Sequence, residues 1–163
     1  MIEVRRASKD QLDTCLAIRF EVFVMGQGVP PQLEVDGHDP DCLHLLAWDR
    51  NHTVGTARLR ITDKGNAKAE RVAVRPGYQS RGVGTALMQA LEDLARQMGH
   101  RELIVTAQLT VLPFYEHLGY VAEGPVFIEA AHDAKTTRGR LRRREGRRAS
   151  AEKPGVTTAD WAG

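Results

Sequence analysis

Several common features are scarce in this chain of 163 residues. Its two cysteines, Cys15 and Cys42, stand in no metal-binding or redox spacing, which argues against a disulfide framework. No apolar stretch approaches the roughly 20 residues that cross a bilayer, and the first residues lack the apolar segment of a secretory signal. We therefore expect a cytoplasmic protein with reduced thiols and no membrane insertion.

The body of the chain has no large excess of either charge, whereas its end is strongly basic. Residues 1–134 carry 14 Lys and Arg against 18 Asp and Glu, whereas residues 135–163 carry 9 against 3. The sequence predicts a folded domain over residues 1–134 and a basic, disordered tail over residues 135–163. Because the tail has no aromatics interleaved with its arginines, we expect only weak, nonspecific contact with polyanions.

Two familiar nucleotide-binding motifs are also absent. The chain lacks both the Gly-x-x-x-x-Gly-Lys-Ser/Thr loop and the Gly-x-Gly-x-x-Gly turn with its later acidic residue. Instead, a Gln-x-x-Gly-x-Gly turn over Gln79 to Gly84 joins a β-rich run to a helix-patterned run. Glycines allow close backbone approach, and the first amides of a helix lack intrahelical partners. The guanidinium of Arg81 adds a phosphate-binding group. The turn predicts a pyrophosphate site, although such a turn alone is also an ordinary helix start.

Hydrophobic periodicity predicts the order β-α-β-β-β-α-β-α-β-β. This order indicates an α/β (α+β) domain in which a mixed sheet has helices on both faces. We expect a helix over residues 84–98 and an irregular, acidic segment over residues 26–41. The last two strands are expected over residues 120–122 and 125–128.

Two segments together resemble the GNAT superfamily of N-acetyltransferases. The glycine turn resembles its acyl-CoA pyrophosphate loop, and Leu112 to Tyr120 resembles the Phe-Tyr-x-x-x-Gly-Phe/Tyr segment near the end of that fold. The resemblance covers roughly residues 3–129. It implies a GNAT fold and acetyl transfer from acetyl-CoA to a small-molecule or peptide amine, by direct attack in a ternary complex.

A narrower likeness points to the ElaA-like branch of that superfamily. It rests on residues 20–27, on the Asp-Gly-x-Asp turn at residues 36–39 and on a strand that begins near His44. Arg19 stands where that branch has an arginine. The later segment, residues 127–137, keeps only the opening Glu-Ala of the branch's closing Glu-x-Gly-Ile-x-His-x-x-Met pattern.

The resemblance also implies roles for individual residues. The strand before the loop would pair with the acyl arm of CoA, and a splay near the end of the next strand would admit that arm. The expected CoA-binding residues are Val72, Ala73, Val74, Gln79, Ser80, Arg81, Gly82, Val83, Gly84, Thr85, Gln108 and Phe114. Tyr115 is expected to be the general acid that protonates the leaving thiolate; otherwise it is a packing aromatic.

The general base and the acceptor pocket stay open at this stage. Glu70 or His44 is a candidate base, and a chain of water molecules is another. The acceptor pocket is expected to involve Arg19, Glu34, Asp36 and His44. The acidic members are compatible with a cationic amine, but each of these residues also fits an ordinary structural or solvated role. No metal site is expected.

Two other functions remain compatible with the sequence. One is an acyl-CoA-binding regulator without turnover, which fits an intact CoA loop beside an ambiguous base. The other is a nucleic-acid-associated protein that is directed by its tail and uses the domain as a scaffold. A homodimer is also compatible, since dimers are common in this fold.

Overall fold

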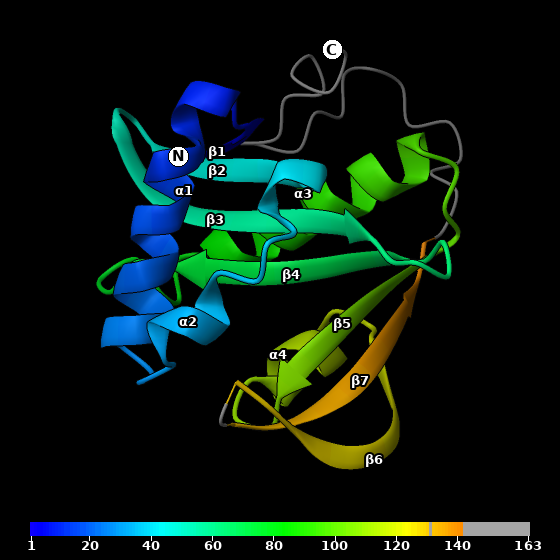
Figure 1. Ribbon diagram of the computed structural model, residues 1–163. Helices are drawn as coiled ribbons and strands as arrows, with labels where there is room; N and C mark the ends of the chain where they lie inside the picture. The colour runs from blue at the N-terminus through cyan, green and yellow to red at the C-terminus, as the bar shows by residue number, and fades with distance from the viewer. Residues whose placement is uncertain (131, 142–163) are drawn as a thin grey trace.

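Seven strands form one sheet in the order β1-β2-β3-β4-β5-β7-β6 (Figure 1). The structure is a computed structural model that describes residues 1–130 and 132–141. The strands are β1 (Ile2–Arg6), β2 (Leu43–Asp49), β3 (His52–Ile61), β4 (Ala67–Val74), β5 (Glu102–Gln108), β6 (Val121–Glu129) and β7 (His132–Arg140). Only β4 and β5 pair in parallel, so the sheet is mixed as predicted.

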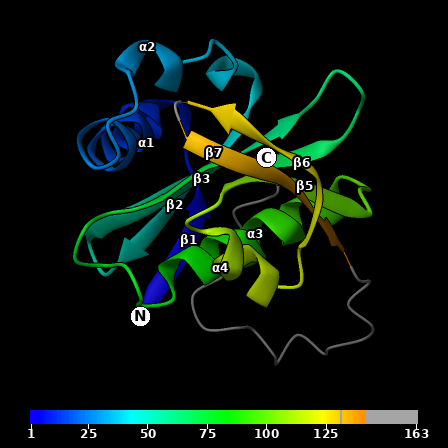
Figure 2. The same ribbon diagram turned by 90° about the horizontal axis from the view of Figure 1, so that it is seen from below.

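Helices cover both faces of this sheet (Figure 2). They are α1 (Leu12–Arg19), the π-helical η2 (Phe20–Met25), α2 (Pro31–Glu34), α3 (Val83–Gln97) and α4 (Leu112–His117), with 3₁₀ turns η1 (Lys9–Gln11) and η3 (Asp39–Asp41). Consecutive strand residues point to opposite faces. Leu45 therefore packs in the cluster that contains the α3 residue Leu87, while Leu46 packs with the α1 residue Ile18.

The sheet opens between its two central strands. β4 and β5 pair only at Lys68 with Ile104 and at Ala69 with Val105, and beyond these pairs they diverge (Figure 1). On its other edge β4 carries a bulge, which is seen as a shift of the register with β3 between Thr56 and Arg58. At this bulge Arg71 takes a left-handed φ of 54°. The splay and the bulge together shape the centre of the molecule.

The predicted end of the domain at residue 134 was wrong. β7 runs from His132 to Arg140, its residues 134–140 pair with the whole of β5, and β6 takes the sheet edge. The two strands predicted over residues 120–122 and 125–128 fall, apart from Tyr120, within the single strand β6. β7 was missed because its buried positions hold the small residues Ala134, Thr137 and Gly139. The rest of the predicted tail, residues 142–163, lies outside the described residues.

Candidate active site

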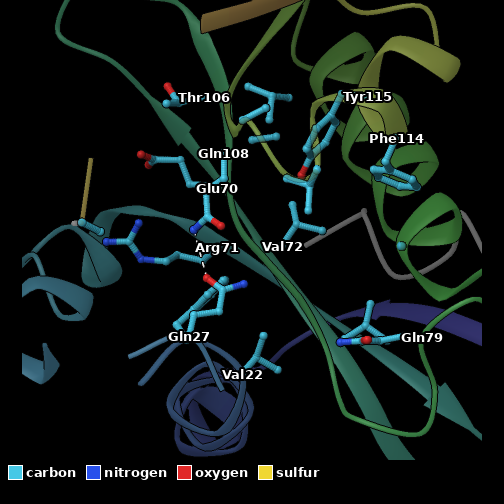
Figure 3. A pocket seen from close by; sticks show the side chains of 18 of the residues that line it. Val22, Gln27, Glu70, Arg71, Val72, Gln79, Thr106, Gln108, Phe114 and Tyr115 are labelled. Atoms are coloured by element: carbon cyan, nitrogen blue, oxygen red, sulfur yellow. Dashed lines mark hydrogen bonds between the residues drawn. The ribbon is translucent and has the colours of Figure 1, made fainter. Parts of the chain in front are cut away.

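A cavity of about 650 Å³ occupies the opening between β4 and β5. One end is lined by the turn before α3 and by α4, and the other by η2, α2 and the end of β6. Figure 3 shows Tyr115 and Phe114 on one side of it, with Glu70, Arg71 and Thr106 on the other. Of the residues predicted for the site, those that line this cavity are Glu34, Glu70, Val72, Val74, Gln79, Ser80, Gly82, Gly84, Thr85, Gln108, Phe114 and Tyr115.

The free edge of β4 supplies hydrogen-bonding backbone to this cavity. The Arg75 amide donates to the Val54 carbonyl of β3 at 2.8 Å, and Ala73 pairs with Thr56 of the same strand. Because successive amides along a strand point to opposite edges, those of Val72 and Val74 face the splay. Both side chains also line the cavity, whereas Ala73 is buried against the α1 layer. An extended ligand can therefore pair with β4 as an added strand.

The glycine turn places free amides at the same cavity. Gly82 precedes α3 with a left-handed φ of 81°, and the first bond inside that helix runs from the Ala86 amide to the Gly82 carbonyl. The amides of residues 83–85 therefore have no intrahelical acceptor. A Cβ on Gly84 would come within 3.2 Å of the Phe114 ring, so glycine there permits close packing of α3 on α4. This geometry fits a pyrophosphate group.

Two members of the predicted loop have other surroundings. Val83, the first residue of α3, is buried in the hydrophobic core and does not line the cavity. The Arg81 guanidinium lies over the Tyr78 ring, 5.1 Å from its centroid, and borders a second hollow beside Gly82 and Thr85. Arg81 therefore approaches the turn from outside the splay.

Tyr115 combines burial with access to the cavity. Its residue is 7% exposed, and its ring makes edge contacts with the rings of Phe114 and Tyr120 at centroid distances of 5.1 and 6.1 Å. Burial raises the pKa of the Tyr115 phenol to about 12, because the low-dielectric surroundings disfavour the phenolate. The hydroxyl is therefore protonated at neutral pH, which is the state that a proton donor requires.

Glu70 is poorly suited to the role of general base. Its carboxylate accepts hydrogen bonds from Arg60 Nε at 2.6 Å and from Arg58 at 3.1 Å, and Lys68 Nζ lies 3.7 Å away. Burial alone would raise the pKa of the Glu70 carboxyl, but the bond from Arg60 and the charges of Arg58 and Lys68 outweigh it and lower this pKa. A carboxylate held by three cations has little affinity for a further proton.

His44, the second candidate base, does not line the cavity. It is buried on β2, where Nε2 lies 2.9 Å from the Asp39 carbonyl oxygen. A carbonyl can only accept, so Nε2 carries the proton of this bond. Nδ1 has no hydrogen-bond partner among the described residues. The position of His44 contradicts its predicted contact with the acceptor.

The acidic segment is neutralised by arginines that come from other elements. Arg19 donates from Nε to Glu34 at 2.6 Å and from Nη1 to Asp39 at 2.7 Å, and it is 1% exposed. Asp36 accepts from Arg58, which is fully buried. Arg19 and Asp36 therefore do not line the cavity, contrary to the prediction, and the segment does not present a free acidic surface. Glu34 is the one acidic residue of this segment among those that line the cavity, beside Gln27, Val29 and Leu33.

Two comparisons identify the protein family. The profile of the acetyltransferase (GNAT) family matches residues 13–120 of the chain. The chain is also 37% identical over 124 residues to the uncharacterized N-acetyltransferase YjcF of Bacillus subtilis, which covers 76% of this chain and 88% of YjcF. This protein belongs to the GNAT acetyltransferase family.

Solved GNAT structures share the fold over nearly their whole length. An acyl-CoA N-acyltransferase from Pseudomonas aeruginosa matches with a TM-score of 0.73 and 28% identity, over 85% of this chain and 98% of that one. ElaA of Escherichia coli matches with a TM-score of 0.74 and 28% identity, over 85% and 99%. The family and fold expected from the two motifs are thus confirmed.

Sequence reasoning missed several residues of this GNAT cavity. Arg71 and Gln27 line it, and the Gln27 side chain accepts a bond from Gln108 at 2.9 Å. Arg58 of β3 was not singled out either, although it is fully buried and contacts Glu70. A charged residue in a strand does not by itself indicate a buried ion pair, because its partners lie elsewhere in the chain. Those of Arg58 come from residues 36–39 and from β4.

The described residues contain no group of three or more His, Cys, Asp or Glu side chains that could hold a metal ion. Within the same residues, no helix is long and apolar enough to cross a membrane.

Proposed function

We propose that this protein is an acetyl-CoA-dependent N-acetyltransferase that moves the acetyl group directly to a primary amine. One observation carries the proposal: the free edge of β4, the amides of the glycine turn and the protonated phenol of Tyr115 all meet at one cavity. Family membership and the likeness to an acyl-CoA N-acyltransferase support acyl-CoA as the donor.

Each part of the cavity has a task in this reaction. The amides of residues 83–85 bind the pyrophosphate of the donor, and those of Val72 and Val74 bind its extended arm and polarise the thioester oxygen. The amine nitrogen bonds to the carbonyl carbon as the carbon–sulfur bond breaks. Tyr115 gives its phenolic proton to the departing sulfur, so that a thiol leaves instead of a thiolate.

The proton of the amine needs a separate acceptor. Glu70 is held by three cations and His44 lies outside the cavity wall, so we assign this step to water in the polar part of the cavity beside Gln27 and Gln108. Direct transfer is favoured over an acyl-enzyme, because Cys15 and Cys42 are buried, do not line the cavity, and have raised pKa values owing to that burial.

Thiol release from acetyl-CoA tests the proposal. The purified chain is incubated with acetyl-CoA and a panel of primary amines, amino acids and peptides with free N-termini, and the acetylated product is identified by mass. A reaction without acceptor corrects for hydrolysis. We expect release that depends on one class of amine. Saturable CoA binding by calorimetry, without release for any amine, would contradict turnover and favour the acyl-CoA-binding regulator.

A further inference from the structure

A network of ion pairs lies behind the acceptor end of the cavity. It joins the cations Arg19, Arg58, Arg60, Lys68 and Arg71 to the carboxylates Glu34, Asp36, Asp39 and Glu70 through nitrogen–oxygen distances of 3.7 Å or less. Five cations therefore face four carboxylates within the described part of the chain. The ring of His44, 3.9 Å from Asp39, would only add positive charge if it were protonated. The network carries one positive charge in excess.

This excess charge reaches the cavity at Arg71. Among the described residues, Arg71 is the one cation of the network that lines the cavity, and its side chain is 21% exposed. The bulge in β4 gives it a left-handed φ of 54°. Figure 3 shows Arg71 at the cavity wall across from Tyr115. An arginine in this position faces whatever molecule attacks the acyl group.

The guanidinium of Arg71 keeps part of its donor capacity free. Nε and Nη2 contact backbone oxygens of Leu33 and Glu34 and the carboxylates of Glu34 and Asp36, at 3.1–3.5 Å. These bonds are long for charge-assisted ones. Nη1 has no hydrogen-bond or ion-pair partner in the residues that the structure describes. The side chain is thus held in place while one nitrogen remains available to a ligand.

The other charged residues of the cavity wall do not cancel the positive charge of Arg71. Glu34 is held by Arg19 and Arg71, and Glu70 by three cations. Glu129 also lines the cavity but is exposed, so its charge is screened by solvent. Neutral side chains make up the rest of the wall around Arg71: the polar Gln27, Thr106 and Gln108, and an apolar part formed by Val22, Phe23, Val29 and Leu33.

From this arrangement we infer that the acceptor is an amine that also carries a carboxylate and an apolar side chain, and that Arg71 binds the carboxylate. The inference rests on the proposed transfer reaction, because it places the acceptor at this end of the cavity. A guanidinium fork with a free nitrogen matches a carboxylate, and the apolar wall matches an aliphatic or aromatic side chain. An acceptor of this kind is an α-amino acid such as leucine, methionine or phenylalanine. The inference replaces the cationic amine that the acidic sequence segment suggested.

The test compares acceptors that differ only at the carboxylate. Leucine, leucinamide and 3-methylbutylamine share one apolar body, and only leucine is anionic there. Initial rates at fixed acetyl-CoA give kcat/KM for each acceptor with wild type, Arg71→Gln and Arg60→Gln. Arg60 belongs to the same network and contacts Glu70, but it does not line the cavity. Both substitutions remove one positive charge, so Arg60→Gln controls for charge at a distance.

We expect wild type to prefer leucine, and Arg71→Gln to lower the leucine-to-leucinamide ratio of kcat/KM about tenfold to a hundredfold. Because the amide also changes the basicity of the amine, the comparison uses this ratio, in which that effect cancels between variants. Arg60→Gln should change it less than about threefold. A wild-type preference for 3-methylbutylamine or for a diamine, or equal ratios in all three proteins, would overturn the inference. A preference that Glu129→Gln removes and Arg71→Gln does not would also overturn it.

A binding measurement separates this inference from the proposed function. If no acceptor is turned over, calorimetry with CoA-saturated protein compares N-acetyl-leucine with N-acetyl-leucinamide. Tighter binding of the acid by wild type, lost in Arg71→Gln, supports the carboxylate site even when the transfer reaction fails. Equal binding of the two, or binding of neither, refutes the site. The wild-type comparison needs no variant, so it holds even if Arg71→Gln is unstable.

Discussion

Tyr115 is the residue on which the proposed proton transfer to sulfur depends. Tyr115→Phe keeps the ring contacts with Phe114 and Tyr120 and removes only the hydroxyl. We expect kcat to fall about tenfold to a hundredfold, at or below the lower end of the ~10²–10⁴-fold range of general acids, because water can partly replace the phenol. The affinity for CoA, measured by calorimetry, should stay within about twofold.

Tyr120→Phe is the matched control for this substitution. Tyr120 is also buried, but its hydroxyl donates to Glu92 at 3.1 Å and does not line the cavity. Its loss should lower stability and leave kcat close to wild type. Equal kcat values in wild type and Tyr115→Phe, in protein that binds CoA normally, would mean that Tyr115 only packs.

At the same scale, the sequence was informative about Tyr115 and uninformative about Glu70. Tyr115 could be placed because its segment has a fixed spacing from the glycine turn. The state of Glu70 depends on Arg58 and Arg60, which lie 12 and 10 residues earlier in the chain. Their spacing of two residues on β3 indicates only that both lie on one face of the sheet. Which charges meet across strands is decided by register, and register is not visible in one strand alone.

At the scale of elements, the turn before α3 contributes both to the proposed donor site and to the stability of the fold. Gly82 has a φ of 81° and open space around its Cα, so Gly82→Ala introduces backbone strain without a clash. The left-handed conformation costs an L-residue about 1–2 kcal/mol, and this sets the expected loss of stability in urea unfolding. A shift of the turn away from this conformation also displaces the amides of residues 83–85. We therefore expect a KM for acetyl-CoA about tenfold higher or more.

Gly65→Ala separates the two effects. Gly65 lies in the turn between β3 and β4 with the same φ of 81° and the same open surroundings, and it does not line the cavity. It should lose similar stability and keep the KM for acetyl-CoA. If both variants raised KM equally, global loosening would explain the change and the turn would have no special part in binding CoA.

The helices and strands differ in how well they can be predicted from the sequence. The amphipathic stripe of α3 and the apolar runs of β2 and β5 were recognisable in the sequence. The interior strand β7 was not, because Gly139 is covered by the Tyr120 ring; a Cβ there would come within 2.4 Å of it. A position that must be small gives no apolar signal. The splay of β4 from β5 was expected only through the family resemblance, because the residues of the two strands do not indicate where their pairing ends.

At the scale of the whole molecule, the ion-pair network fastens the segment between α1 and β2 to the sheet. Arg19 comes from α1, Arg58 from β3 and Arg71 from β4, and all three bind carboxylates of residues 34–39. This segment supplies the Leu33 and Glu34 wall of the cavity. The shape of the acceptor end therefore depends on charges that are 15 to 37 residues apart in sequence. The same connection makes the fold sensitive to acid.

Protonation of this network should destabilise the folded chain. Burial would raise the pKa values of Asp36 and Asp39, but hydrogen bonds from Arg58 and Arg19 outweigh it and lower both, and Glu70 is lowered in the same way. A carboxyl whose pKa is lower in the folded than in the unfolded state stabilises the fold above its unfolded pKa, about 4. That contribution is lost as the pH falls through about 4 towards the folded value. We expect urea unfolding to show a loss on the order of 1 kcal/mol per carboxylate between pH 7 and pH 3.

Asp36→Asn isolates one member of the network in this measurement. At pH 7 it should be less stable than wild type, because Arg58 is fully buried and loses a charged partner. The gap should stay constant down to about pH 4 and narrow below it, because Asp36 then takes up a proton in the unfolded wild type while it stays ionised in the folded state. Asp63→Asn, at an exposed carboxyl in the turn after β3, should show no such gap. A gap for Asp36→Asn that does not change between pH 7 and pH 3 would show that this carboxylate does not contribute to acid sensitivity, and that the segment is held by the remaining pairs.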